Sequence, residues 1–286
     1  MDSTRLTMEA VALPGTVLNS LLDWFYPRHC YHCGRHLQDS GARILCGACS
    51  KELADGRIVG AKCAICGLPL AGAAVGRLPV PDEAIAGSPL AGEAAGGLPH
   101  AGELEAAPLC ITCRAEERHF DLARAIVTYA GPASSVIRAF KFGGQFFLGP
   151  RFLEAMLDRG WMPPEIGGAE LVAPVPLHPR RRRERGYDQA LLLARVLAKR
   201  LGGKLLPGVL VRTRYTSQQA LLPVARRWDN VRGAFGVRDA AKFRGRRVLL
   251  VDDVMTTGMT ASECARVLKK AGAEHVQVLT LARPAP

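Results

Sequence analysis

Two adjacent carboxylates and a turn of threonines and glycine make residues 248–260 the segment of this sequence best suited to chemistry. An apolar run ends at Asp252 and Asp253, and Gly258 stands where a helical pattern begins. Carboxylates accept hydrogen bonds from sugar hydroxyls, and backbone N–H groups around a glycine at a helix N-terminus face a phosphate dianion. We therefore expect this segment, named the Asp–Thr segment below, to bind a phosphorylated sugar. The residues predicted to do so are Asp252, Asp253, Thr256, Thr257, Gly258 and Thr260.

A purely structural interpretation of the Asp–Thr segment is that Thr256 caps a helix while the two acids end a strand. This interpretation explains one residue and leaves the adjacent acids and the remaining threonines without a role. The segment also lacks the GxxxxGK[ST] pattern of a P-loop. The pattern therefore favours a site for a sugar phosphate.

Cysteine spacing predicts two metal centres in the N-terminal part of the chain. Eight of the nine cysteines form CxxC pairs, which together supply the thiols of two tetrahedral four-cysteine zinc sites. We expect sequential pairing, with the first two pairs on one ion and the last two on another, and an interleaved pairing stays open. Disulfides and redox chemistry are alternatives, but no secretion signal and no thioredoxin-like context is evident. The predicted ligands are Cys30, Cys33, Cys46, Cys49, Cys63, Cys66, Cys110 and Cys113, with His29, His32 and His36 as bystanders and Cys264 as a core residue.

Arginines gather in two blocks of the C-terminal half. Five of the six residues 180–185 are arginine, and they follow the apolar run 171–175. Arginine presents a planar fork of donors that suits a diphosphate, so we expect diphosphate binding here; a solvated basic turn is the alternative. The second block spans residues 212–235. The residues expected to bind diphosphate are His178, Arg180 and Arg181 in the first block.

Hydrophobic periodicity predicts the elements that must position these residues. Short apolar runs predict strands at 125–129, 171–175, 246–252 and 275–282, and amphipathic runs predict helices at 134–142, 145–157, 189–201 and 260–271. Strands alternating with helices favour an α/β fold with a parallel sheet, whose ligands bind beyond the carboxyl ends of the strands. A stretch rich in Ala, Gly and Pro near 70–107 is expected to be a disordered insertion. The length of 286 residues favours two domains, 1–117 and 118–286.

Charge is divided unevenly between these two parts. Residues 1–117 hold 9 Lys and Arg against 13 Asp and Glu, whereas residues 118–286 hold 29 against 13. The basic part favours a polyanionic ligand, either a phosphate-rich small molecule or nucleic acid, although solubility or coding bias is an alternative. No run approaches the roughly 20 apolar residues that span a bilayer. The short apolar stretch 17–27 is expected to be a docking helix rather than a signal peptide, and the protein to be cytoplasmic.

The Asp–Thr segment resembles the phosphoribosyl-diphosphate loop of purine and pyrimidine phosphoribosyltransferases at every motif position. Together with residues 137–142, 174–189, 212–235 and 279–283 and the cysteine pairs, it is similar to the ComF family of competence-associated, phosphoribosyltransferase-like proteins. The resemblance implies a type I phosphoribosyltransferase-like parallel sheet with flanking helices, preceded by a small double zinc ribbon. It implies two structural zinc ions and phosphoribosyl diphosphate bound with Mg²⁺. It also implies a hood over the ligand at 212–235, with Arg212, Arg214 and Gln218 as the hood residues. The insertion before Cys110 is longer than expected for the family.

Two functions are compatible with these residues. The first is a phosphoribosyltransferase, a glycosyltransferase of the pentosyl class, acting on a nitrogen acceptor that the sequence does not identify. The second is a non-catalytic accessory protein of natural transformation that binds a phosphoribosyl ligand or nucleotide while its basic surface contacts single-stranded DNA or DNA-uptake proteins. Only Tyr187, Tyr215 and Trp228 lie among the arginines, so a base-stacking platform has little support from the sequence. The oligomeric state is not predictable from these patterns.

Overall fold

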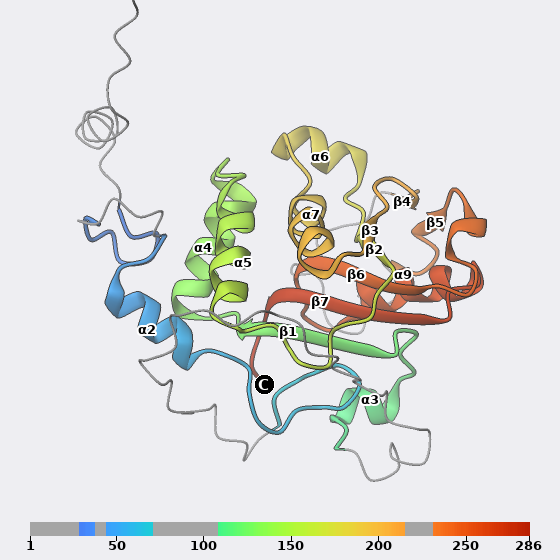
Figure 1. Ribbon diagram of the computed structural model, residues 1–286, viewed down its shortest axis with the longest axis horizontal. Helices are drawn as coiled ribbons and strands as arrows, with labels where there is room; N and C mark the ends of the chain where they lie inside the picture. Colours follow the sequence, from blue (N-terminus) through green and yellow to red (C-terminus); the bar gives the residue numbers. More distant parts are fainter. Residues whose placement is uncertain (1–28, 38–43, 71–107, 215–230) are drawn as a thin grey trace, which may run out of the picture.

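The fold is built on a parallel β-sheet whose main strands are the predicted apolar runs. The computed structural model describes residues 29–37, 44–70, 108–214 and 231–286 (Figure 1). Every pairing in the five-stranded sheet is parallel, which confirms the predicted α/β class. The strands lie in the order β1 (Leu122–Thr128), β7 (His275–Arg283), β6 (Arg247–Val254), β2 (Leu171–Pro174) and β3 (Lys204–Leu205).

Helices cover both faces of this sheet because strand β6 is apolar on both sides. Leu249 and Val251 join a core with helices α4 (Gly131–Phe142), α5 (Leu148–Asp158) and α7 (Gln189–Leu201), which lie together on one side of the sheet (Figure 1). Val248 and Leu250 join a second core with helix α9 (Met259–Lys270). Burying each of these four side chains contributes about 1.5–3 kcal/mol, so the carboxyl end of β6 is held firmly from both faces.

The predicted strands and helices agree with the observed ones to within three residues at their ends. The elements that the sequence did not predict are short or lack an apolar stripe. They are α2 (Gly47–Asp55), α3 (Ile111–Ala115), α6 (Pro179–Arg185), β3 (Lys204–Leu205), β4 (Leu210–Arg212), β5 (Phe235–Val237) and the 3₁₀-helix η2 (Ala240–Phe243). The docking helix expected at 17–27, the insertion near 70–107 apart from Leu70, and Gln218 lie outside the described residues.

Two cysteine clusters extend the two cores of the sheet. Most of the first cluster (Cys30, Cys33, Cys46, Cys49) packs with the α4–α5 core, and the second cluster (Cys63, Cys66, Cys110, Cys113) packs with the α9 core. The second cluster also lies along β1, where the Ala123 N–H donates to the Ile65 carbonyl at 2.8 Å. At Gly67 the backbone has φ 67°, and a Cβ atom there would lie 2.6 Å from the Ala123 carbonyl oxygen. This close approach requires glycine.

Candidate functional site

The Asp–Thr segment lies beside the carboxyl end of β2. At this point the chain leaves the two neighbouring strands, β2 and β6, toward opposite faces of the sheet. Pro174 pairs with Val251, so the residues that follow both strands meet at one edge. After β2 the chain passes through α6 into α7 on one face of the sheet, and after β6 it enters α9 on the other. Ligands of open α/β sheets bind in the crevice that such a divergence creates.

Gly258 turns the chain from β6 into α9. It is the N-cap of the helix, with a positive φ of 77° that favours glycine. Its carbonyl accepts the N–H of Ser262 at 2.8 Å, which is the first bond of the helix. The backbone N–H groups that precede Ser262 at the start of α9 have no intrahelical acceptor, and they carry the positive end of the helix dipole. The turn therefore offers backbone donors to an anion.

Thr257 adds a side-chain donor at this turn. Its hydroxyl oxygen is buried, and no hydrogen-bond partner for it exists among the residues that the structure describes. A buried hydroxyl without a partner costs about 1–3 kcal/mol, and a phosphate oxygen would remove that cost. The neighbouring Thr256 side chain is exposed and Thr260 is half-buried. The structure thus brings the predicted threonines to the N-terminus of one helix.

The two carboxylates are paired with a lysine from a distant helix. Lys141, near the end of α4, places its Nζ 2.9 Å from Asp253 Oδ1, and both side chains are largely buried. Burial lowers the pKa of Lys141, but the charges of Asp253 and Asp252 outweigh it and raise the pKa above the usual range. Lys141 lies in a segment that resembles the ComF family, yet sequence reasoning assigned it no role. The contact joins residues that are 112 positions apart, so no local pattern could reveal it.

Asp252 holds its proton more tightly than an ordinary carboxyl group does. Burial, and then the charge of Asp253, raise its pKa to about 7, while Lys141 acts in the opposite direction. One Asp252 oxygen accepts the Asp253 N–H at 2.9 Å. A third acid, Asp188, caps α7 by accepting the Leu191 N–H at 3.0 Å. Burial raises the pKa of Asp188, and the charge of Asp253 adds to this effect. The site therefore brings carboxylate oxygens together around one paired lysine.

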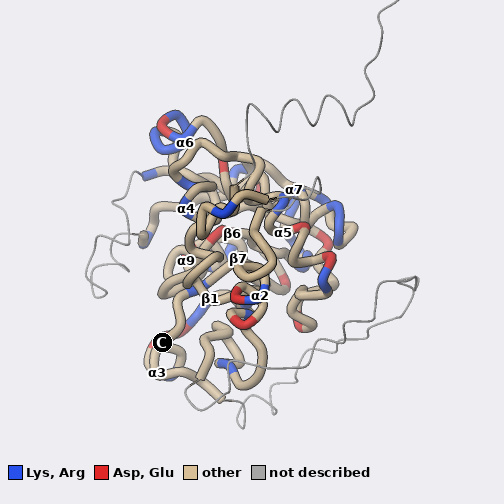
Figure 2. The backbone as a smooth tube through the Cα atoms, turned by 90° about the vertical axis from the view of Figure 1, so that its left-hand side faces the viewer, with Lys and Arg blue, Asp and Glu red and all other residues tan. Residues whose placement is uncertain are grey.

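The first arginine block is a helix, α6, which corrects the turn considered from the sequence. Pro179 occupies its first turn, and Nδ1 of His178 accepts the Arg180 N–H at 3.2 Å as the N-cap. Gly186, with φ 78°, ends the helix. None of the α6 residues is buried, so the helix has no apolar stripe that periodicity could detect. The basic residues of this helix are all arginines, and the colour for Lys and Arg covers much of the α6 tube in Figure 2.

The residues predicted to bind diphosphate share one electrostatic environment. Burial, followed by the charge of Arg212 and the arginines of α6, lowers the pKa of His178. Burial, followed by the charge of Arg181, lowers the pKa of Arg212, and Asp252 opposes this shift. Arg212 thus experiences both the positive charge of Arg181 in α6 and the negative charge of Asp252. This arrangement concentrates positive charge next to the acidic site.

The second arginine block is anchored by an antiparallel stem. Strand β4 pairs with β5, with Arg212 opposite Phe235. Beyond the strands, Arg214 Nη2 donates to the Arg232 carbonyl at 2.9 Å. Glu263 of α9, which is fully buried, accepts the Gly233 N–H at 2.8 Å and fixes this stem to the helix that begins at Gly258.

Both cysteine clusters have the geometry of a four-cysteine zinc site. The four sulfur atoms of each lie within 4.8 Å of one another, in the sequential grouping rather than the interleaved one. Cys33 and Cys46 sulfurs are 3.7 Å apart, as are those of Cys66 and Cys110. Zn–S bonds of about 2.3 Å in a tetrahedron place sulfurs about 3.8 Å apart. The residues present therefore fit two structural zinc ions.

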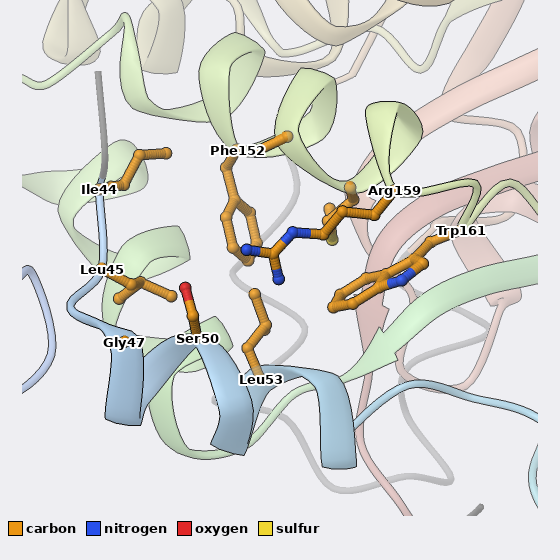
Figure 3. Close-up of a pocket in the computed structure, with 10 residues that line it drawn as sticks. Ile44, Leu45, Gly47, Ser50, Leu53, Phe152, Arg159 and Trp161 are labelled. Atoms are coloured by element: carbon orange, nitrogen blue, oxygen red, sulfur yellow. The ribbon is translucent and has the colours of Figure 1, made fainter. Parts of the chain in front are cut away.

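A cavity of about 310 Å³ lies away from the Asp–Thr segment, between the first cysteine cluster and α5 (Figure 3). Ile44, Leu45 and Leu53 form one wall, Phe152 and Trp161 form the other, and Arg159 lies across the space. The lining residues include no carboxylate, histidine or cysteine. Among the described residues, this cavity is therefore lined mainly by packing surfaces.

Two families of known domains match the sequence. A double zinc ribbon domain matches residues 21–80, and a phosphoribosyl transferase domain matches residues 188–285. Competence protein F of Haemophilus influenzae is 35% identical over 178 residues, which cover 61% of this chain and 78% of that protein. The chain belongs to the ComF family. The DNA utilization protein YhgH of Escherichia coli is 33% identical over 161 residues, 55% of this chain and 70% of that protein.

Solved structures give a weaker likeness. The allosteric regulatory enzyme of purine biosynthesis is 25% identical, with 46% of this chain and 25% of that chain covered and a TM-score of 0.31. An adenine phosphoribosyltransferase from Thermoanaerobacter pseudethanolicus is 17% identical, with 52% and 84% covered and a TM-score of 0.29. The type I phosphoribosyltransferase-like fold of the ComF chain is assigned instead from the domain match and the parallel sheet.

Proposed function

We propose that the Asp–Thr segment binds phosphoribosyl diphosphate together with Mg²⁺. The observation that carries this proposal is the buried Thr257 hydroxyl, which has no partner among the described residues and lies at a glycine turn a few residues after two acids. The 5-phosphate lies at the N-terminus of α9, and the ribose hydroxyls donate to Asp252 and Asp253. Mg²⁺ prefers oxygen ligands, and when bound it supplies charge neutralisation to the diphosphate. Asp252 and Asp253 would hold the ion indirectly, because they bind the ribose hydroxyls of the ligand that carries it.

The diphosphate extends toward α6 in this proposal. The charges of Arg180, Arg181 and Arg212 all act on His178, and the charges of Arg181 and Asp252 act on Arg212. Arginine forks stabilise a leaving diphosphate through paired hydrogen bonds. Transfer would break the bond between C1′ and a diphosphate oxygen, which leaves with the electron pair. A nitrogen lone pair forms the new bond to C1′, and its proton passes to solvent. The stem at Arg212 and Arg214 would help to exclude water.

Isothermal titration with phosphoribosyl diphosphate and Mg²⁺ tests the binding proposal. We expect saturable binding by the wild-type chain, and a tenfold or greater loss in Asp252→Asn/Asp253→Asn and in Thr257→Val. Asp158→Asn is the matched control, because this exposed acid pairs with Arg200 far from the segment. Absence of wild-type binding would refute the proposal. Diphosphate release in the presence of a panel of amines and nucleobases then separates a transferase from a binding protein.

A second candidate function, binding of single-stranded DNA, is favoured by an exposed aromatic surface beside α6. Phe142 and Phe146 are 66% and 57% exposed. The Arg185 guanidinium lies 5.1 Å from the Phe142 ring centroid, and the Phe146 and Tyr187 rings are 6.2 Å apart. A stacking platform had little support from the sequence, since the phenylalanines are distant in the chain from the arginines they meet. Aromatic faces interleaved with arginines suit unpaired bases and their phosphates.

The names of the two relatives agree with this second function, and we propose that the chain acts in the cytoplasm on DNA taken up during competence. Anisotropy of a labelled oligothymidylate should show binding that weakens with salt. Phe142→Ala/Phe146→Ala should weaken it about 5- to 150-fold per stacked base lost. Ile111→Ala, at an exposed apolar residue of α3, is the control. Equal binding of duplex DNA, or an unchanged affinity in the double variant, would contradict the platform.

A further inference from the structure

Arg283 connects the second cysteine cluster with the Asp–Thr segment. It is the last residue of β7 and is only 4% exposed. Its Nη1 donates to the carbonyl of Cys66, and its Nη2 lies 3.5 Å from the carbonyl oxygen of Thr256. One guanidinium therefore touches a cysteine knuckle and the residue that precedes Thr257.

The surroundings of Arg283 are unusual for a buried cation. Within the described residues its guanidinium donates to carbonyl oxygens, and no carboxylate forms an ion pair with it. A buried charge without a counter-charge is costly. A zinc ion with four thiolate ligands has a net charge of about −2, so a metal-loaded second cluster supplies the missing negative charge beside Arg283.

The position of the Cys66 carbonyl depends on the cysteine knuckle. The Gly67 N–H donates to the Cys63 carbonyl at 2.9 Å, and the Cys63 N–H donates to the Leu68 carbonyl at 2.8 Å. These bonds close the turn that brings Cys63 and Cys66 to a common metal position. A metal ion on the four sulfurs fixes this turn, and with it the acceptor that orients Arg283.

A different arginine attaches the same cluster to the sheet. Arg124 donates from Nη1 to the Ala64 carbonyl at 3.1 Å, and its Nε lies 3.0 Å from Glu165 Oε1. Lys62 pairs with the same Glu165 oxygen at 3.1 Å. Attachment of the cluster therefore has contacts of its own, and among these residues Arg283 is the one that reaches the Asp–Thr segment.

We infer that Arg283 is a positioning residue that makes the Asp–Thr segment dependent on metal occupancy of the second cysteine cluster. The metal fixes the Cys66 carbonyl, this carbonyl orients the guanidinium, and the guanidinium holds the Thr256 carbonyl. As far as ligand affinity is concerned, the inference rests on the proposed binding of phosphoribosyl diphosphate. Coupling is reciprocal, so a ligand at the segment should also raise the affinity of the second cluster for zinc.

The test compares loss of the second metal in three backgrounds of the full chain: wild type, Arg283→Met and Arg124→Met. Cys110→Ser removes a ligand of the second cluster, and Cys46→Ser, in the first, is the control. Zinc content verifies each variant. Hydrogen exchange of the amides at 256–260 reports on the segment without any ligand, and titration with phosphoribosyl diphosphate and Mg²⁺ reports on affinity.

We expect Cys110→Ser to speed exchange at 256–260 and to weaken binding about 5- to 150-fold in the wild-type and Arg124→Met backgrounds. In the Arg283→Met background it should have no further effect, and Arg283→Lys should restore part of the coupling. An equal effect of Cys110→Ser in all three backgrounds would overturn the inference. If the wild type fails to bind the ligand, the proposed function is wrong, and hydrogen exchange still decides the coupling. If Cys110→Ser does not fold, chelator titration of wild type and Arg283→Met, with zinc release and exchange followed together, gives the same comparison.

Discussion

Removal of Lys141 should destabilise the ComF chain far more than removal of a surface lysine. Lys141→Met leaves Asp253 buried without its partner at 2.9 Å and removes the cation that opposes the raised pKa of Asp252. At an effective dielectric constant near 20, a charge pair at this distance is worth about 6 kcal/mol before desolvation. Breaking a buried pair from one side costs about 3–5 kcal/mol. We expect a loss in that range at pH 8.

Urea unfolding of a double-mutant cycle measures this loss. Asp253→Asn in the Lys141→Met background should recover most of the lost stability. The double variant has a neutral amide next to methionine, so the unpaired buried charge of Asp253 is gone and only the Asp252 charge is left. Lys242→Met serves as control, since its pair with Asp239 at 3.2 Å is exposed on both sides and should contribute less than about 1 kcal/mol. A cost of Lys141→Met no larger than the control, or no recovery in the double variant, would refute the electrostatic description of the site.

Two further predictions concern pH and backbone geometry. The native chain holds the Asp252 proton up to about pH 7, whereas the unfolded chain releases it near the usual value of 3.8. The free energy of unfolding should therefore fall as pH rises through this window, by at most about 4 kcal/mol. In thermal melts at pH 5 to 8, Asp252→Asn should reduce the dependence of stability on pH. An equal dependence on pH in both proteins would contradict the raised pKa of Asp252. Gly67→Ala should lower the melting temperature and zinc retention more than Gly34→Ala, because both have positive φ but only at Gly67 does the new Cβ meet a carbonyl, at 2.6 Å. Equal losses would show that the close approach to β1 is unimportant.

Local patterns explain why much of this structure was predictable. Strand β6 reads as an apolar run because both of its faces are buried, and the Asp–Thr segment follows it directly in the chain. The CxxC pairs are likewise visible in the local sequence. The sequential grouping follows if each zinc ribbon binds its metal with the two pairs that are consecutive in the chain.

Contacts made across the fold were not predictable from such patterns. Lys141 reaches Asp253 across 112 residues, and Arg283 reaches Cys66 across 217. Helix α6 escaped prediction because its capping residues, rather than an apolar stripe, define it. The exposed phenylalanines were overlooked since they meet the arginines only after α4 and α6 come together.

The most direct test of the central claim is a crystal structure grown with phosphoribosyl diphosphate and Mg²⁺. We predict the 5-phosphate against the Thr257 hydroxyl and the backbone N–H groups that begin α9, the ribose hydroxyls at Asp252 and Asp253, and the diphosphate toward His178 and Arg181. A ligand bound elsewhere, or a Thr257 hydroxyl that has no contact with phosphate at full occupancy, would contradict the account.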